Sequence, residues 1–184
     1  MQKCVGIDFE NANCEQTSAC SLGLVVLENF KITEQRYWLI KPPMSYFKPE
    51  FIQIHGLQWN DVKDSPAFGE IWHEIEPYIS DRLLFAHNAG FDAGVLRSLI
   101  NFYHLPHKKI TYFDTLLLSK AAWKHLPSHK LNNLAEYIGK SFHHHNALED
   151  AKMCANIVIK IADEYQATDV VALVRRFNLK IKKL

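Results

Sequence analysis

Two acidic residues two positions apart end the first apolar segment of the chain. Residues 3–8 have the pattern of a short strand, which puts Asp8 and Glu10 at its end with Phe9 between them. Alternate side chains of a strand share a face, so the two carboxylates point to one side and Phe9 to the other. Adjacent carboxylates repel each other, and two interpretations are open: a cation site, or an ordinary solvated strand end.

A third acidic residue, Asp92, follows a later apolar segment. The run from His87 to Asp92 lies at an expected strand-to-helix junction, where free main-chain amides and the helix dipole attract anions. Asp92 is therefore either an acid that stabilises the helix or part of a ligand site. Gly90 favours the second interpretation, because glycine lets the main chain approach another group closely.

The fourth acidic residue, Asp150, lies in the first turns of the longest helical pattern, residues 147–165. Asn146, with Glu149 three residues later, resembles a capping box, so the helix is expected to begin there with His145 just ahead of it. Glu149 then has a structural role, whereas Asp150 is either a solvated helix acid or a ligand. We expect His145 and Asp150 at the same end of the helix.

The four acidic residues together suit one kind of chemistry. Hard divalent cations such as Mg²⁺ take oxygen ligands from carboxylates and from substrate phosphates. Carboxylates from three elements can hold two ions about 3.5–4 Å apart, the spacing used for in-line phosphoryl displacement. His145, on a loop beside such a site, suits a general base. We expect the acidic surroundings to keep its pKa at or above about 6.5.

The order and spacing of these residues resemble the DEDDh exonucleases, a family with a ribonuclease-H-like fold. Its members include the proofreading subunit of bacterial DNA polymerase III and RNase T. The family's first motif, Asp-x-Glu after a strand, corresponds to residues 7–10, its second to residues 87–92 and its third to residues 145–151. Landmarks at residues 54–57, 114–117 and 131–139 also fit, and the resemblance covers about residues 3–165.

The resemblance implies a role for each matched residue. It assigns two Mg²⁺ or Mn²⁺ ions to Asp8, Glu10, Asp92 and Asp150, and the general base to His145. Asparagine follows the first motif where the family often has threonine, which affects contacts to the 3′ terminus and not metal binding. Without the resemblance, the sequence explains His55 and Leu57 equally well as ordinary core and surface residues. The implied contacts to the terminal nucleotide are Phe9, Asn11, His55, Leu57, Asn88 and Phe91.

The implied function is a metal-dependent 3′→5′ exonuclease that releases nucleoside 5′-monophosphates, with DNA favoured as substrate. The implied partners are single-stranded or frayed 3′ ends of nucleic acid and a DNA polymerase. Two alternatives stay open: a 3′→5′ exoribonuclease similar to RNase T or oligoribonuclease, and a non-catalytic module that binds nucleic acid or a polymerase. The choice between DNA and RNA depends on room for the 2′-hydroxyl, which no motif encodes.

The elements that must position these residues follow the order of a mixed sheet. Strands are expected at residues 3–8, 20–27, 32–40, 82–87 and 110–113, with two helical pieces between residues 49 and 79. Later helical patterns begin near residues 90, 114, 131 and 147. Three strands followed by strands alternating with helices predict an α/β fold, a mixed five-stranded sheet flanked by helices.

The C-terminal residues differ in charge from the rest of the chain. Residues 1–168 are interpreted as one exonuclease domain, and residues 169–184 as a basic C-terminal helix or tail. A solvated helix end and a segment that contacts phosphate or a partner protein are both consistent with this charge. From residue 175 onward there is no acidic residue, and five are basic: Arg175, Arg176, Lys180, Lys182 and Lys183.

The run of three histidines at residues 143–145 invites a zinc-site interpretation. Adjacent residues do not easily converge on one tetrahedral ion, and no cysteine is near in the sequence. We therefore expect His143 and His144 to be solvated.

Composition excludes several other classes of protein. The 184 residues include 21 basic and 20 acidic side chains, a formal net charge of +1, so no overall basic charge indicates a nucleic-acid coat. Residues 1–8 lack a signal-peptide pattern, and the longest apolar stretch, residues 22–27, is far too short to span a membrane. The four cysteines have no framework spacing, so we expect a cytoplasmic protein with reduced thiols.

Overall fold

The computed structural model describes residues 3–184. Its centre is a six-stranded mixed sheet in the order β3-β2-β1-β4-β5-β6. β1 runs antiparallel to β2 and parallel to β4, so it has a partner on both sides and is largely buried. The strands are β1 (Lys3–Asn11), β2 (Ala19–Glu28), β3 (Lys31–Leu39), β4 (Leu83–Ala86), β5 (Thr111–Asp114) and β6 (Lys182–Lys183).

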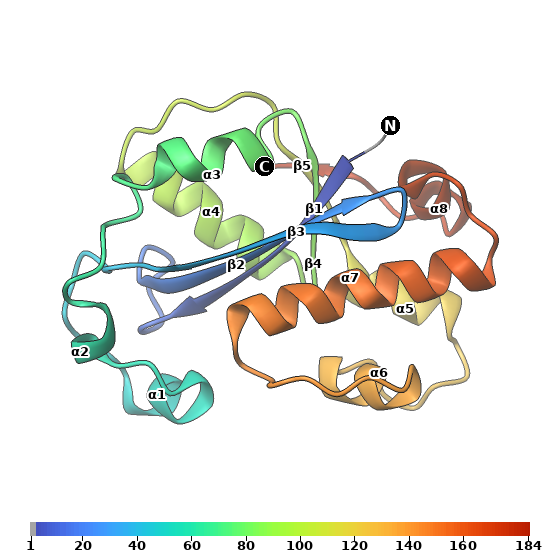
Figure 1. Ribbon diagram of the computed structural model, residues 1–184, viewed down its shortest axis with the longest axis horizontal. Helices are drawn as coiled ribbons and strands as arrows, with labels where there is room; N and C mark the ends of the chain where they lie inside the picture. Colours follow the sequence, from blue (N-terminus) through green and yellow to red (C-terminus); the bar gives the residue numbers. More distant parts are fainter. Residues whose placement is uncertain (1–2) are drawn as a thin grey trace.

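Helices cover both faces of the sheet (Figure 1). One apolar cluster, with Phe68 and Leu96, lies under α3 and α4, and a second, with Trp123 and Ile157, lies under α5, α6 and α7. No helix within residues 3–184 is long and apolar enough to cross a membrane. The helices are α1 (Pro49–His55), α2 (Trp59–Val62), α3 (Trp72–Ile79), α4 (Gly90–Phe102), α5 (Thr115–Ala122), α6 (Leu131–Tyr137), α7 (Ala147–Glu164) and α8 (Val170–Arg176).

The α/β class and the mixed sheet are confirmed, whereas the predicted number of five strands is wrong. The additional strand, β6, pairs with Thr111 and Tyr112 on the outer edge of β5. The two residues of β6 show no alternation of apolar and polar side chains that would predict a strand. They form one because they pair with the edge strand β5. The region between residues 49 and 79 likewise forms three short helices, not two.

The C-terminal residues pack on the body of the domain. α8 buries Val170 and Leu173 in the same apolar cluster as α7. The exposed side chains of Lys182 and Lys183 lie at the amino end of β5. Asp114, at the carboxyl end of that strand, accepts a hydrogen bond from the main chain that follows β4. These two lysines are therefore at the opposite end of β5 from the site described below.

A glycine lets α7 cross the sheet in main-chain contact. Gly23 of β2 pairs with Asp8 of β1. A Cβ atom added to Gly23 would collide with the main chain of Ala147 and Leu148, the first residues of α7. Only glycine permits this approach, because it has no side chain. The crossing brings the first turn of α7 beside the end of β1, where Asp8 lies.

We expect Gly23→Ala to lower the free energy of unfolding by about 1–3 kcal/mol or more, because a clash with main chain cannot be relieved by a rotamer change. Thermal or chemical denaturation measures the loss. Gly90→Ala is the matched control, because no atom outside its own helix main chain and its two chain neighbours lies within 4 Å of a Cβ added there. Equal destabilisation by the two substitutions would contradict the close crossing.

Candidate active site

An open cavity of about 520 Å³ lies where the carboxyl ends of β1 and β4 meet the first turns of α4 and α7. The structure brings together here all four acidic residues and the histidine that the sequence motifs single out. The cavity is lined by Asp8, Phe9, Glu10, His87, Asn88, Phe91, Asp92, Lys130, Leu131, Asn132, His144, His145 and Asp150.

Three of the carboxylates form one group. Oxygen atoms of Asp8, Glu10 and Asp150 all lie within 4.8 Å of one another, close enough to share a cation. Asp92 lines the same cavity, and its Oδ1 accepts a hydrogen bond from the main-chain N–H of Phe9 at 3.0 Å. That bond holds the first turn of α4 directly against β1.

Burial and mutual repulsion disfavour the ionised forms of these acids. Loss of solvation, then the charges of Asp150 and Asp92, raise the pKa of Glu10 to about 8. Burial raises the pKa of Asp92 to about 7, although the hydrogen bond from the main chain of Phe9 lowers it in part. The pKa of Asp150 is raised by burial, and that of Asp8 by burial and then by the three other carboxylates.

The donor set of the cavity fits hard divalent cations. Carboxylate oxygens are the protein ligands that Mg²⁺ and Mn²⁺ prefer. A bound cation would also remove the repulsion that raises these pKa values. Acids with raised pKa values in a cleft are typical of functional sites.

His145 precedes α7 with its main chain in the left-handed region, at a φ of 67°. This conformation costs a non-glycine residue about 1–3 kcal/mol, so neighbouring contacts must maintain it. The main-chain N–H of His145 donates to Oδ2 of Asp150 at 3.1 Å. Asn146 caps α7, as expected, by accepting from the main-chain N–H of Glu149 at 3.2 Å, but the Glu149 side chain binds Lys152 and does not complete the expected capping box.

The pKa of His145 is lower than its ordinary value, not higher. Burial lowers it first, nearby His144 and His55 lower it further, and Asp150 opposes them. The expected pKa at or above about 6.5 is therefore wrong. The reason is that lost solvation of the imidazolium outweighs its attraction to the carboxylates.

His144 is only partly exposed, and the expectation that it is solvated is wrong. Its Nδ1 lies 3.1 Å from Oδ1 and 3.2 Å from Oδ2 of Asp150. Its ring stacks on that of His145, with 3.8 Å between the ring centroids. His143 is exposed, as expected. The left-handed His145 lies between His144 and the start of the helix that carries Asp150.

Asn88 and Phe91 line the cavity from the junction of β4 and α4. The main-chain N–H of Asn88 donates to Oδ1 of Asp114, which also caps α5. Phe91 keeps 43% of its surface exposed, so its ring presents an apolar face to a flat ligand. Phe9 also lines the cavity, but its ring is buried in the apolar core next to that of Phe68.

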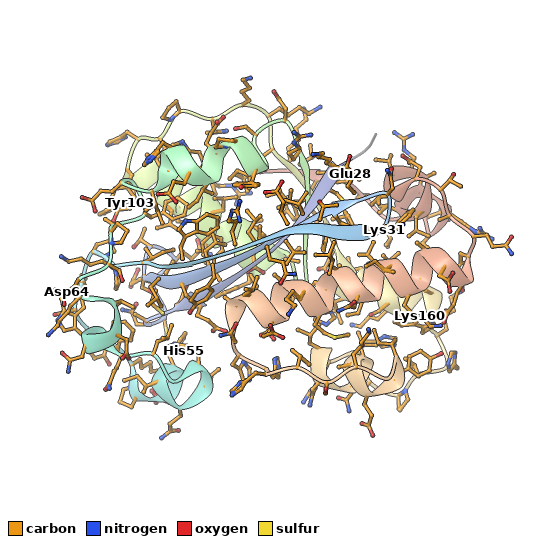
Figure 2. All side chains as sticks on the ribbon, viewed as in Figure 1. Glu28, Lys31, His55, Asp64, Tyr103 and Lys160 are labelled. Carbon is orange, nitrogen blue, oxygen red and sulfur yellow. The ribbon has the colours of Figure 1, made fainter. Side chains whose placement is uncertain are left out.

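His55 contacts both Asn11 and Leu57, and none of these three residues lines the cavity. His55 ends α1 (Figure 2) and lies 3.0 Å through Nε2 from the carbonyl oxygen of Asn11. The main-chain N–H of Leu57 donates to its Nδ1, also at 3.0 Å. Because the carbonyl can only accept, the ring is neutral with its proton on Nε2. Both ring nitrogens therefore form hydrogen bonds with main-chain atoms, and His55 connects the end of α1 to the end of β1.

Five residues of the cavity are not among the site residues predicted from the sequence: His87, Lys130, Leu131, Asn132 and His144. Lys130 and Asn132 come from the start of α6. Among the cavity residues of the described chain, Lys130 alone has a permanent positive charge. The Nε2 of His87 donates to the carbonyl of His129 at 2.8 Å and so holds the chain just before Lys130. No short motif marks Lys130, because its position depends on how α6 packs.

The chain matches known exonucleases in sequence. The model of the exonuclease family matches residues 5–158. The DNA polymerase III PolC-type protein of Caldanaerobacter subterraneus subsp. tengcongensis is 31% identical over 172 residues, 89% of this chain and 12% of that protein. The 3′-5′ exonuclease DinG of Staphylococcus haemolyticus is 28% identical over 160 residues, 86% of this chain and 18% of that protein. The chain thus spans less than a fifth of the length of these relatives.

Solved structures share the fold. Exonuclease X, in complex with 5′ overhanging duplex DNA, superposes with a TM-score of 0.71 at 23% identity, covering 92% of this chain and 99% of that one. The nuclease domain of 3′hExo, a DEDDh family member bound to rAMP, superposes with a TM-score of 0.74 at 16% identity, covering 100% and 98%.

We expect the metal-free protein to lose stability as the pH rises from about 5 to 8. Glu10 and Asp92, with pKa values of about 8 and about 7 when folded, ionise near 4 in the unfolded chain. The folded state therefore binds more protons in this range, and the free energy of unfolding falls as the pH rises. Thermal denaturation in EDTA measures the trend, and a rising profile would contradict it.

Two comparisons connect this trend to the carboxylates. Glu10→Gln should flatten the profile, because it removes one of the raised groups. Mg²⁺ should raise the melting temperature most at the alkaline end, where the carboxylates are ionised and repel one another most.

Proposed function

Because the chain belongs to the exonuclease family, we propose that it is a 3′→5′ exonuclease that releases nucleoside 5′-monophosphates from the end of a nucleic acid. The observation that carries the proposal is the convergence of four carboxylates and one histidine in an open cavity. A module that only binds nucleic acid has no use for four carboxylates, because the phosphate backbone is itself negative. The residues are Asp8, Glu10, Asp92, Asp150 and His145.

Two divalent cations, Mg²⁺ or Mn²⁺, are part of the proposal. Asp8, Glu10 and Asp150 are close enough to hold one ion jointly, and Asp92 supplies a further carboxylate to the same cavity. When bound, such ions offset the charge of the phosphate and make water a stronger nucleophile near neutral pH. The carboxylates bind the cations only when ionised. Because their pKa values are raised, we expect cation binding to be weaker in acid.

His145 is the general base in this proposal. A base must be neutral to accept a proton, and the lowered pKa of His145 keeps its ring neutral at pH 7. Its main-chain hydrogen bond to Asp150 holds the residue beside the carboxylate group.

The walls of the cavity suit the last nucleotides of a strand. The exposed face of Phe91 supports stacking of a base, a contact that tolerates any sequence. Lys130 supports binding of a phosphate next to the carboxylates. A terminal nucleotide reaches the carboxylates only when unpaired, so single-stranded or frayed 3′ ends are the preferred substrates.

DNA is the favoured substrate, and a DNA polymerase the favoured partner, because the PolC-type relatives are DNA polymerases. The alternative, an exoribonuclease, requires that the cavity accept the 2′-hydroxyl of a terminal ribonucleotide.

Oligonucleotide digestion tests the reaction. We expect 5′-labelled single-stranded DNA to give a ladder of products shortened from the 3′ end, with Mg²⁺ or Mn²⁺ and not with EDTA. A mismatched 3′ terminus should be cut faster than a paired one, because its unpairing free energy is already lost. Full activity after chelation would contradict the cation site, and a ladder on RNA alone would overturn the preference for DNA.

Asp8→Asn is the control for the reaction, because it removes one carboxylate and keeps the shape of the side chain. We expect it to remain folded and to lose hydrolysis by orders of magnitude. An unfolded variant would show that Asp8 is a structural acid.

The pH dependence of kcat tests His145. At Mg²⁺ concentrations that saturate the site at every pH, we expect kcat to rise with pH through an apparent pKa below about 6.5 and then level off, because the base works only when neutral. His145→Ala should lower kcat by about 10²–10⁴-fold and leave stabilisation by Mg²⁺ largely intact. Lost stabilisation by Mg²⁺ in this variant would show that His145 binds the ion instead.

A further inference from the structure

His144 contacts both an acid and the histidine that the proposed reaction uses. Its Nδ1 is within 3.2 Å of both carboxylate oxygens of Asp150. Its ring lies nearly parallel to that of His145, at an angle of 17° and a centroid distance of 3.8 Å. Phe142 lies against it, with 5.4 Å between the ring centroids. His144 therefore connects two groups that the family motif treats as separate.

Within the described residues, the ring of His145 pairs with one other aromatic ring, that of His144. Within residues 3–184, its imidazole nitrogens make no hydrogen bond, and its one polar contact is the main-chain N–H bond to Asp150. A general base needs a third group to orient it. Stacking on His144 is therefore the contact from which we infer an orienting effect on this ring.

Asp150 has two donors, one from the main chain and one from a side chain. The N–H of His145 donates to Oδ2, and the ring of His144 approaches Oδ1 and Oδ2. A carboxylate that binds a cation is ionised and can only accept hydrogen bonds, so Nδ1 of His144 must then carry the proton. Such partners of metal-binding carboxylates set their orientation.

We propose that His144 is a positioning residue that orients Asp150 through a hydrogen bond and His145 through ring stacking. The proposal rests on the proposed function. It separates His144 from the neighbouring His143, which is exposed and makes no hydrogen bond or ion pair within the described residues. Removal of a group of this kind typically weakens metal affinity or activity about 10–100-fold.

A different role for His144 is direct ligation of a cation. Nitrogen atoms of His144 and His145 and an oxygen of Asp150 lie within 4.8 Å of one another, which also suits a transition-metal ion. The stacked rings argue against this role, because their nitrogen lone pairs lie in parallel planes and do not converge on one point.

Three substitutions separate the two contacts of His144. His144→Ala removes both, His144→Asn keeps a donor for Asp150 and loses the stacked ring, and His144→Phe keeps a stacked ring and loses the donor. His143→Ala is the matched control. For each variant, thermal denaturation titrated with Mg²⁺ gives the cation affinity, single-turnover digestion at saturating Mg²⁺ gives the rate, and NMR of the histidine rings gives the order of His145.

We expect His144→Ala to weaken Mg²⁺ affinity and to lower the rate, together by about 10–100-fold. His144→Asn should recover the affinity and not the rate, whereas His144→Phe should recover the rate at saturating Mg²⁺ and the order of the His145 ring. His143→Ala should match the wild type. Wild-type values for His144→Ala, or identical behaviour of the Asn and Phe variants, would overturn the proposal.

Failure of the proposed function has a different result. A wild-type protein with no activity on any oligonucleotide would count against the exonuclease proposal. The Mg²⁺ titration and the NMR measurement would still decide the role of His144, because neither depends on hydrolysis. Tight binding of Zn²⁺ that disappears in both His144→Ala and His144→Phe would identify His144 as a ligand and overturn the positioning role.

Discussion

Mutual repulsion among four carboxylates in one cavity is the constraint that the rest of this structure must satisfy. Burial removes the water that would otherwise screen these charges, and the pKa of Glu10 rises to about 8 as a result. Such an arrangement opposes folding, so it persists only because other contacts impose it. A bound cation would offset the solvation free energy that the carboxylates lose on burial. Buried carboxylates of this kind are therefore expected to bind a metal ion.

The contacts that impose the site come from the sheet and the two apolar layers beside it. β1 is paired on both sides, and helices cover both faces of the sheet (Figure 1). Asp92 is held by the main chain of Phe9, and Asp150 by the main chain of His145. Gly23, which pairs with Asp8, lets the first turn of α7, which carries Asp150, lie close to the sheet. Burial of apolar side chains on each face of the sheet stabilises the fold and offsets the unfavourable free energy of the buried carboxylates.

The histidines around the cavity divide into two kinds. His55 and His87 use ring nitrogens to hold main-chain carbonyls, at Asn11 and His129. His144 and His145 stack on each other beside Asp150 and face the cavity. A histidine within a family motif is therefore not by itself a ligand or a base. Its partners decide whether its nitrogens are available for chemistry.

The sequence by itself determined the site's acids, their elements and the family, because those signals are local. The alternation Asp8-Phe9-Glu10, the cap at Asn146 and the apolar periods depend on near neighbours along the chain. The tertiary structure alone decided the rest: the sixth strand, the approach of Lys130 and the pairing of His144 with Asp150. These features depend on how distant segments pack and on a left-handed turn at residue 145, and no short-range pattern encodes either.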